Sequence, residues 1–533
     1  MIQCTSRCSY LLLLAASLSV ALPSPVIPAE SAGSSSPVMS PFVFTEARGP
    51  YSVGLKVIEQ YDHSRTYRAV TNERGEAFHG ERARPVQTLV WYPSERSPSK
   101  VMTVEDYMAL WLTETSFGDS RPSLVARQWR SALGRTLNQS LWSVRDAPAV
   151  RARFPVVIYA PSLSKSSWEN ADLCEYLSSQ GYVVIAGPSL GPHTLEMPLD
   201  LTGINAQAQD ISFLIGFART LPDTDLSSVA VMGFSWGGIS NLFAAARDSR
   251  IGALIDLDGS VRYYPGLVKQ AGDVHPESMT LPLLAFLARN FSLEDEDHFV
   301  AKADRDGPSV LNAWTHGDLW TVHMLGMAHA EFSSMHQRND DLWWEFDNVW
   351  PMMQGDFTRE DAMRGFGWVA QYCLQFLNAY LKHDAAALAF LTKTPAQNGV
   401  PAHVMEMTYR PRTGAPLSFD SFRSEIGRKG FDHIDEVYAD FKRQSSDFEL
   451  SSLEVNDWAE SLLGDGNVPA CILVLKLIVE LYPNSADSYV RLAGAYALSG
   501  NKQRAVENYH LALRKDPSNG ESRRMLYLMS VGK

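Results

Sequence analysis

The fold of this chain is decided by the stretch Gly233-Phe234-Ser235-Trp236-Gly237-Gly238. An apolar run at 229–232 precedes this stretch and is typical of a buried parallel strand, and residues 239–247 are typical of a helix. A strand, a Gly-x-Ser-x-Gly turn and a helix in this order predict a nucleophile elbow, a sharp turn that presents the serine hydroxyl above a sheet. Bulky side chains two positions either side of Ser235 would collide in such a turn, which explains the glycines there.

Apolar runs of strand length recur on both sides of this turn. They lie at 85–93, 154–160, 182–187, 251–258, 281–288 and 319–325, and the last of these is the last strand that we expect. Helical patterns accompany them at 168–180, 206–219 and 361–382. Because apolar strands alternate with helices, we expect an α/β domain over 49–410, built on a mostly parallel sheet with helices on both faces. Residues 102–147 are expected to form a helical insertion.

The pattern changes near residue 415, where helices dominate. The positions that a 34-residue tetratricopeptide unit needs are occupied by Tyr489, Leu492, Ala493, Tyr496, Gly500, Ala505, Tyr509, Ala512 and Pro517. Looser matches place the stretch from about 452 in the same register. We therefore expect a helical linker over 411–450 and a small all-α, tetratricopeptide-like region over 451–533, which is able to bind a partner protein. A helical hairpin without that role is the alternative.

The first 21 residues predict a secretory signal peptide. Their apolar core at 11–21 is short for a membrane span, and Ser19-Val20-Ala21 forms a small-residue cleavage site. Residues 22–48 are rich in proline and serine and predict a flexible linker. We expect a secreted or periplasmic protein, with an uncleaved N-terminal anchor as the alternative.

Charge and cysteine content narrow the classes of partner. The 533-residue chain has a formal net charge of −13, which argues against nucleic acid as the main partner. Three cysteines remain after the predicted leader, Cys174, Cys373 and Cys471, and their apolar helical surroundings favour packing over disulfide formation. No histidine or cysteine pair has metal-ligand spacing, and no second glycine loop suits a phosphate, so we expect neither a metal nor a cofactor.

An activated serine needs an acid and a histidine, which follow it in the chain order Ser, Asp or Glu, His. Asp258 is our choice for the acid, because it ends the strand that follows the elbow helix, at the carboxyl edge of the sheet. Asp256 shares its face of that strand but lies deeper, where a structural role is expected. Asp295 and Asp297 follow the next strand and stay open as alternatives.

His329 is the preferred base, since it lies on a glycine-marked loop just past the last expected strand. His323, inside that strand, and His316 and His298, in polar loops, are its rivals. The oxyanion hole needs two backbone N–H groups. We expect one from Trp236, directly after the serine, and the other from Leu163 in the loop at 161–164.

An aromatic cluster follows His329 and comprises Trp343, Trp344, Phe346 and Trp350. Such a cluster is suited to cap an apolar acyl pocket, and ordinary core packing explains it equally well.

Several of these segments resemble a known family. The segments at 49–54, 84–93 and 154–187, the elbow and Leu257-Asp258 resemble the secreted platelet-activating-factor acetylhydrolase-like branch of α/β-hydrolases, with dienelactone-hydrolase-like proteins as wider kin. The resemblance covers roughly 49–395. It implies an α/β-hydrolase fold and a serine esterase for short or oxidised acyl groups that needs no cofactor and no calcium.

The sequence departs from the family in its insertions at 102–147 and 289–318, which match poorly, and at two places near the expected site. Ser235 stands where the type enzyme of the dienelactone hydrolases uses cysteine. Pro161-Ser162-Leu163-Ser164 stands where the family's oxyanion loop usually reads His-Gly-Leu-Gly. Because of the second difference, the geometry of the oxyanion loop and the range of substrates do not follow from the resemblance.

The sequence thus predicts an exported serine hydrolase that cleaves carboxylic esters of small-molecule or lipid-like substrates. Ser235 is the nucleophile, His329 the base and Asp258 the acid, with Trp236 and Leu163 at the oxyanion. A peptidase or thioesterase with the same triad is one alternative. The other is a non-catalytic scaffold that binds a partner through its C-terminal helices.

Overall fold

The computed structural model describes residues 41–72, 74–118, 124–288, 309–340, 358–446 and 448–532. The predicted leader at 1–21, the alternative acids Asp295 and Asp297, and the aromatic cluster at 343–350 lie outside these residues, as does His298. The chain divides into two compact units, Met1–Thr413 and Gly414–Lys533.

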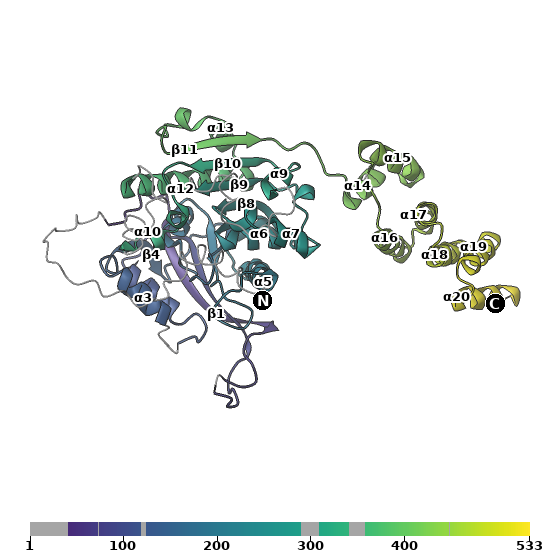
Figure 1. Cartoon of the computed structure of the whole chain (residues 1–533), viewed down its shortest axis with the longest axis horizontal. Coiled ribbons are helices and arrows are strands. Elements are labelled where there is room, and N and C mark those ends of the chain that lie inside the picture. Colours follow the sequence, from purple (N-terminus) through teal and green to yellow (C-terminus); the bar gives the residue numbers. More distant parts are fainter. Residues whose placement is uncertain are drawn as a thin grey trace, which may run out of the picture. The chain divides into compact units, whose positions relative to one another are not determined.

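The first unit is built on a sheet of 11 described strands in the order β11-β10-β9-β8-β7-β5-β6-β2-β1-β4-β3. The strands are β1 (Ser52–Thr66), β2 (Ala83–Ser94), β3 (Val101–Thr103), β4 (Ser140–Arg145), β5 (Phe154–Ala160), β6 (Val183–Ala186), β7 (Thr224–Phe234), β8 (Ile251–Leu257), β9 (Leu283–Ala288), β10 (Leu319–Met324) and β11 (Met405–Arg410). Figure 1 shows β11, β10, β9 and β8 in this order from the upper edge of the sheet.

Six neighbouring strands, from β6 through β5, β7, β8 and β9 to β10, run parallel. Antiparallel partners adjoin this block, β2 beside β6 and β11 beside β10. The expected α/β-hydrolase architecture, a mostly parallel sheet followed by an all-helical C-terminal part, is confirmed. The parallel block brings the carboxyl ends of β5, β7, β8 and β10 to one edge, where ligands bind in open sheets of this kind.

Helices cover both faces of the sheet because the central strands are apolar on both sides. In β7, Ala230 and Met232 belong to one core, whereas Val229 and Val231 belong to the other, as the two-residue period of a strand requires. The first core includes residues of α2 (Val104–Trp111), α4 (Ala171–Ser179), α12 (Arg359–Leu381) and α13 (Ala385–Leu391). The second includes residues of α5 (Leu201–Ala218), α6 (Trp236–Arg247), α7 (Pro265–Ala271) and α9 (Val310–Ala313).

Three sequence expectations need correction in this unit. Residues 102–147 do contain helices α2 and α3 (Leu124–Ala132), but they also contain β4, which pairs in parallel with β1. The strand β11 was not expected, because its sequence MEMTYR alternates with polar residues at the antiparallel edge of the sheet. The end of the predicted linker at 22–48 is not free chain, since Phe42 is fully buried against Phe366.

The three cysteines after the predicted leader are free thiols and buried, which confirms that they serve packing. Among the residues that the structure describes, no helix is both long and apolar enough to cross a membrane.

The second unit contains only helices among its described elements. These are α14 (Phe419–Lys429), α15 (Ile434–Gln444), α16 (Ser452–Gly464), α17 (Val468–Leu481), α18 (Ala486–Leu498), α19 (Lys502–Lys515) and α20 (Gly520–Ser530). One core joins residues from α14 to α19, so the helices at 411–450 are part of this unit and not a separate linker. Ala493, Ala505 and Ala512 are fully buried, which lets α18 and α19 pack closely.

Candidate active site

Ser235 lies between the end of β7 and the start of α6, in a strained backbone conformation. Its φ of 53° and ψ of −119° lie where residues other than glycine are rarely found. The conformation is held from both sides, because the Ser235 carbonyl accepts hydrogen bonds from the N–H groups of Gly238 (3.0 Å) and Ser260 (2.8 Å). The turn therefore has the geometry of a nucleophile elbow, as the sequence predicted.

The glycines of the turn are required by close contacts. A Cβ atom on Gly233 would lie 2.5 Å from the carbonyl carbon of Gly237. A Cβ on Gly237 would lie 2.1 Å from the carbonyl oxygen of Ala160 at the end of β5. Neither neighbour is a flexible side chain, so the Gly-x-Ser-x-Gly pattern is here a steric requirement of the turn.

His329 contacts both other members of the predicted triad. It follows β10 and opens a short 3-10 helix, His329–Phe332. Its Nε2 lies 2.9 Å from the Ser235 Oγ, and its Nδ1 lies 2.5 Å from Asp258 Oδ2. The tautomer that satisfies both contacts carries a proton on Nδ1, which leaves Nε2 free to accept the serine proton.

Asp258 is fully buried directly after β8, with a positive φ of 43°. Its second carboxylate oxygen, Oδ1, accepts the N–H of Ala288 at 2.8 Å. Burial alone would raise the pKa of Asp258, but the hydrogen bond and charge of His329, the charge of Arg262 and the Ala288 N–H together hold this pKa below its usual value. The carboxylate is thus kept ionised and fixed toward the His329 ring.

Asp256 lies two residues earlier in β8 and differs from Asp258 in its electrostatics. The carboxylate hydrogen-bonded to His329 is that of Asp258. Burial, and next the charge of Asp258, raise the pKa of Asp256 well above its usual value, so the neutral acid is favoured. Among the rival histidines within the described residues, His323 lies in β10 and His316 precedes it, whereas His329 is the one that contacts Ser235.

The two expected oxyanion donors line one pocket with Ser235. Trp236 is the first residue of α6, and Leu163 lies in the loop after β5. Buried Glu169 anchors that loop by accepting hydrogen bonds from the Ser162 N–H (2.8 Å) and the Ser162 hydroxyl (2.5 Å). These two hydrogen bonds fix Ser162, the residue before the expected donor Leu163.

The pocket at Ser235 is small, about 50 Å³, and its described lining carries no carboxylate. It is formed by Ser162, Leu163, Lys165, Leu199, Phe234, Ser235, Trp236, Ser260, Tyr264, His329, Ala330 and His336. The ring of Trp236 packs edge-on against that of Tyr264, another lining residue, at a centroid distance of 5.4 Å. Sequence reasoning did not single out Lys165 or His336. The proximity of Lys165 to the predicted oxyanion loop was the one signal available.

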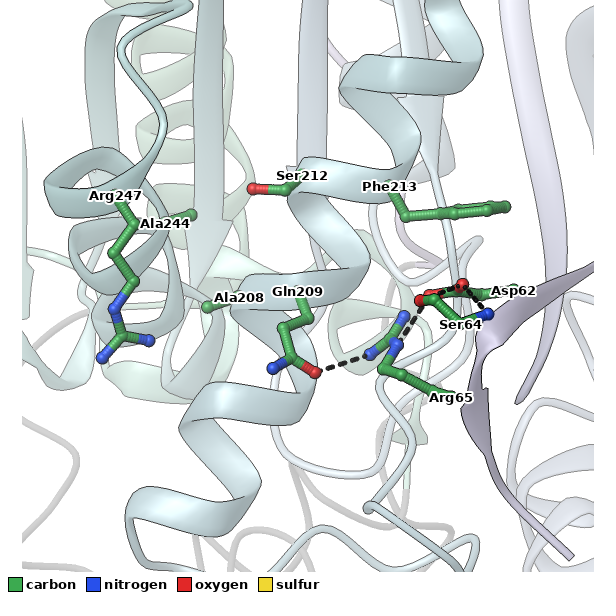
Figure 2. A pocket seen from close by; sticks show the side chains of 9 residues that line it. All are labelled: Asp62, Ser64, Arg65, Ala208, Gln209, Ser212, Phe213, Ala244 and Arg247. Carbon is green, nitrogen blue, oxygen red and sulfur yellow. Dashed lines mark hydrogen bonds and ion pairs between the residues drawn. The ribbon is translucent and has the colours of Figure 1, made fainter. Parts of the chain in front are cut away.

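A larger hollow of about 580 Å³ lies elsewhere in the same unit and shares no residue with this pocket (Figure 2). Its arginines are already paired. Arg65 contacts Asp62 at 2.6 Å, as the dashed lines in Figure 2 show, and Arg247 contacts Asp273 at 2.7 Å. The hollow offers volume but no unpaired reactive group among its described residues.

Comparison with known proteins gives matches among solved structures alone. No family model and no curated protein matches the chain. Among solved structures, the chain is similar to a ferulic acid esterase from Streptomyces cinnamoneus, with 19% sequence identity and a TM-score of 0.46 over 69% of this chain and 98% of that chain. This likeness carries no argument about the site, so the roles of the site residues depend on their geometry.

Proposed function

We propose that this protein is an exported serine hydrolase that cleaves carboxylic esters with short or modified acyl groups. The observation that carries the proposal is the hydrogen-bonded chain from the Ser235 hydroxyl through the His329 ring to the Asp258 carboxylate, 2.9 Å and 2.5 Å long at its two links. A serine hydroxyl is a weak nucleophile until a base removes its proton. In this series of hydrogen bonds, His329 is the base, and Asp258 orients its ring toward the hydroxyl.

In the first half of the reaction, Ser235 Oγ attacks the ester carbonyl carbon while His329 Nε2 takes the hydroxyl proton. The carbonyl oxygen becomes an oxyanion, which the backbone N–H groups of Trp236 and Leu163 stabilise. The bond to the leaving alcohol then breaks, and His329 returns the proton to that alcohol. Asp258 stabilises the imidazolium that exists between these two transfers.

In the second half, water replaces the alcohol. His329 takes a proton from water, the resulting hydroxide attacks the acyl carbon, and the bond to Ser235 breaks as its oxygen recovers the proton. The products are a carboxylic acid and the free enzyme. Export is proposed from the residues at 1–21, and the C-terminal helices are proposed to bind a protein partner.

The test is hydrolysis of p-nitrophenyl butyrate by wild type, Ser235→Ala and Ser227→Ala. Ser227 lies exposed on the same strand and provides the matched control. We expect Ser235→Ala to lower kcat by roughly 10⁴- to 10⁶-fold, whereas Ser227→Ala keeps wild-type turnover. Turnover that survives in Ser235→Ala would contradict the proposal.

A substrate panel separates the proposal from its alternatives. A peptidase or thioesterase with the same triad would prefer amide or thioester analogues over the matched ester. A non-catalytic scaffold would hydrolyse none of them.

A further inference from the structure

Lys165 is a buried cation that the reaction described above does not use. It follows the predicted oxyanion loop, is 5% exposed, and lines the pocket that contains Ser235. Its Nζ lies 4.8 Å from the centre of the Trp129 ring. Among the residues that the structure describes, no carboxylate forms an ion pair with Nζ and no group accepts a hydrogen bond from it.

The negative charge that favours the protonated form of Lys165 is that of Glu169, whose carboxylate is already engaged. Glu169 accepts hydrogen bonds from Ser162, at its N–H and its hydroxyl, and from the Tyr159 hydroxyl at 3.1 Å. Burial lowers the pKa of Lys165, and the charge of Glu169 opposes this effect. Burying an ammonium group without a hydrogen-bonded partner is unfavourable, so its position at the pocket indicates a partner that arrives with the ligand.

His336 limits the charge of that ligand. It lines the same pocket and is 4% exposed. Burial, and next the charges of Lys165 and His329, lower the pKa of His336 well below its usual value, so the ring is neutral. Lys165 is therefore the one fixed cation among the described lining residues. A single cation in a pocket of about 50 Å³ matches a carboxylate, whereas a phosphate dianion would need further donors.

We propose that Lys165 is a specificity-determining residue that binds a carboxylate of the substrate, so that the enzyme prefers esters carrying a carboxylate a few bonds from the scissile carbonyl. This inference rests on the proposed function. The carboxylate belongs either to the acyl part, as in a half-ester of a short dicarboxylic acid, or to the alcohol part, as in an ester of a hydroxy acid. The ammonium and the carboxylate form a charge-assisted hydrogen bond in place of the missing protein partner.

Two matched pairs of substrates test the preference. Monoethyl succinate is compared with ethyl levulinate, in which a methyl ketone replaces the carboxylate at nearly the same size. For the alcohol side, 4-acetoxybutanoate is compared with 5-acetoxypentan-2-one. We expect wild type to show a kcat/KM roughly 10- to 100-fold higher for the charged member of at least one pair.

Lys165→Met removes the charge while it keeps the length of the side chain. We expect this variant to lose the 10- to 100-fold preference through a higher KM for the charged ester. Lys393→Met makes the same change at an exposed position and serves as the control that keeps the preference. The inference is overturned if wild type hydrolyses both members of both pairs equally well, or if Lys165→Met lowers turnover of charged and neutral esters by the same factor.

A binding measurement separates this inference from the proposed function. Calorimetry with Ser235→Ala, which needs no turnover, should show tighter binding of monoethyl succinate or 4-acetoxybutanoate than of its neutral partner, and a loss of the difference in Ser235→Ala/Lys165→Met. Hydrolysis of neutral esters without any charge preference overturns the role of Lys165 alone. Charge-selective binding without hydrolysis by wild type overturns the esterase proposal and keeps the carboxylate site.

Discussion

The Ser235 pocket is much smaller than the hollow between Arg65 and Arg247, but it contains the more reactive side chains. The hollow is about 580 Å³ and the pocket about 50 Å³. Each arginine of the hollow is neutralised by a carboxylate within 2.7 Å. The pocket instead gathers a strained serine, a histidine and a buried lysine without a described ion-pair partner. Convergence of reactive groups, and not volume, therefore marks the candidate site.

Removing one carboxylate from each region should give the largest difference between the two regions, which is a difference in catalytic activity. Asp258→Asn places an amide beside His329, which favours the wrong ring tautomer, and we expect kcat/KM for p-nitrophenyl butyrate to fall roughly 10⁴-fold. Asp62→Asn removes one of the two carboxylates that pair with Arg65, the other being that of Asp210, and should leave kcat/KM within about threefold. Initial rates of the two purified variants check this. Equal losses in both would remove the distinction between the two regions.

Adding one methyl group beside each region should change stability in opposite directions. Gly237→Ala places a Cβ 2.1 Å from the Ala160 carbonyl oxygen, and we expect it to lower the free energy of unfolding by about 2–3 kcal/mol. Gly216 lies in α5, which also lines the hollow, and nothing within 4 Å would meet its Cβ. Gly216→Ala should therefore stabilise by about 0.5–1 kcal/mol. Urea unfolding measures both; a Gly237→Ala variant as stable as wild type would count against the close packing of the elbow.

The smallest expected difference between the two regions is in how stability depends on pH. The raised pKa of Asp256 means that the native state holds its proton above pH 4 while the unfolded chain loses it, so this group's contribution to stability falls as pH rises. Asp256→Asn should therefore gain stability relative to wild type as pH rises from 4 to 7.

Asp62 should respond in the opposite sense. Burial favours a higher pKa, but hydrogen bonds from Ser64 and Arg65 hold the pKa of Asp62 below its usual value. Its contribution to stability is present above about pH 4 and is lost as pH falls through the lowered pKa. Asp62→Asn should be less stable than wild type at pH 7, with a smaller deficit at pH 3. Urea unfolding from pH 3 to pH 7 measures both variants, and parallel pH profiles would contradict the assignment.

The central strands and the elbow were predictable because their signals are local. The apolar runs at 154–160 and 251–258, and the glycines around Ser235, each report a local requirement for burial or for a sharp turn. The order Ser235, Asp258, His329 follows the chain order that such a serine requires, and Asp258 could be chosen because parallel strands end at one edge of a sheet. The structure brings these three residues together as expected.

The features of the fold and of the site that the sequence did not predict depend on contacts between distant segments. The strand β4 forms because it pairs with β1, and Phe42 is buried because α12 covers it, and neither partner can be read from the segment itself. The importance of Lys165 becomes visible only once the nearby carboxylate of Glu169 is seen to be engaged by Ser162 and Tyr159. A sequence pattern shows which residues are present but not which of them already have partners.

The most direct measurement is reaction of the full-length protein with a fluorophosphonate probe, followed by mass mapping of the modified peptide. Because the His329–Asp258 pair activates one hydroxyl, we expect one probe per chain, attached to Ser235, and strongly slowed labelling in Asp258→Asn. No labelling, or labelling at another serine while Ser235 stays unmodified, would contradict the account.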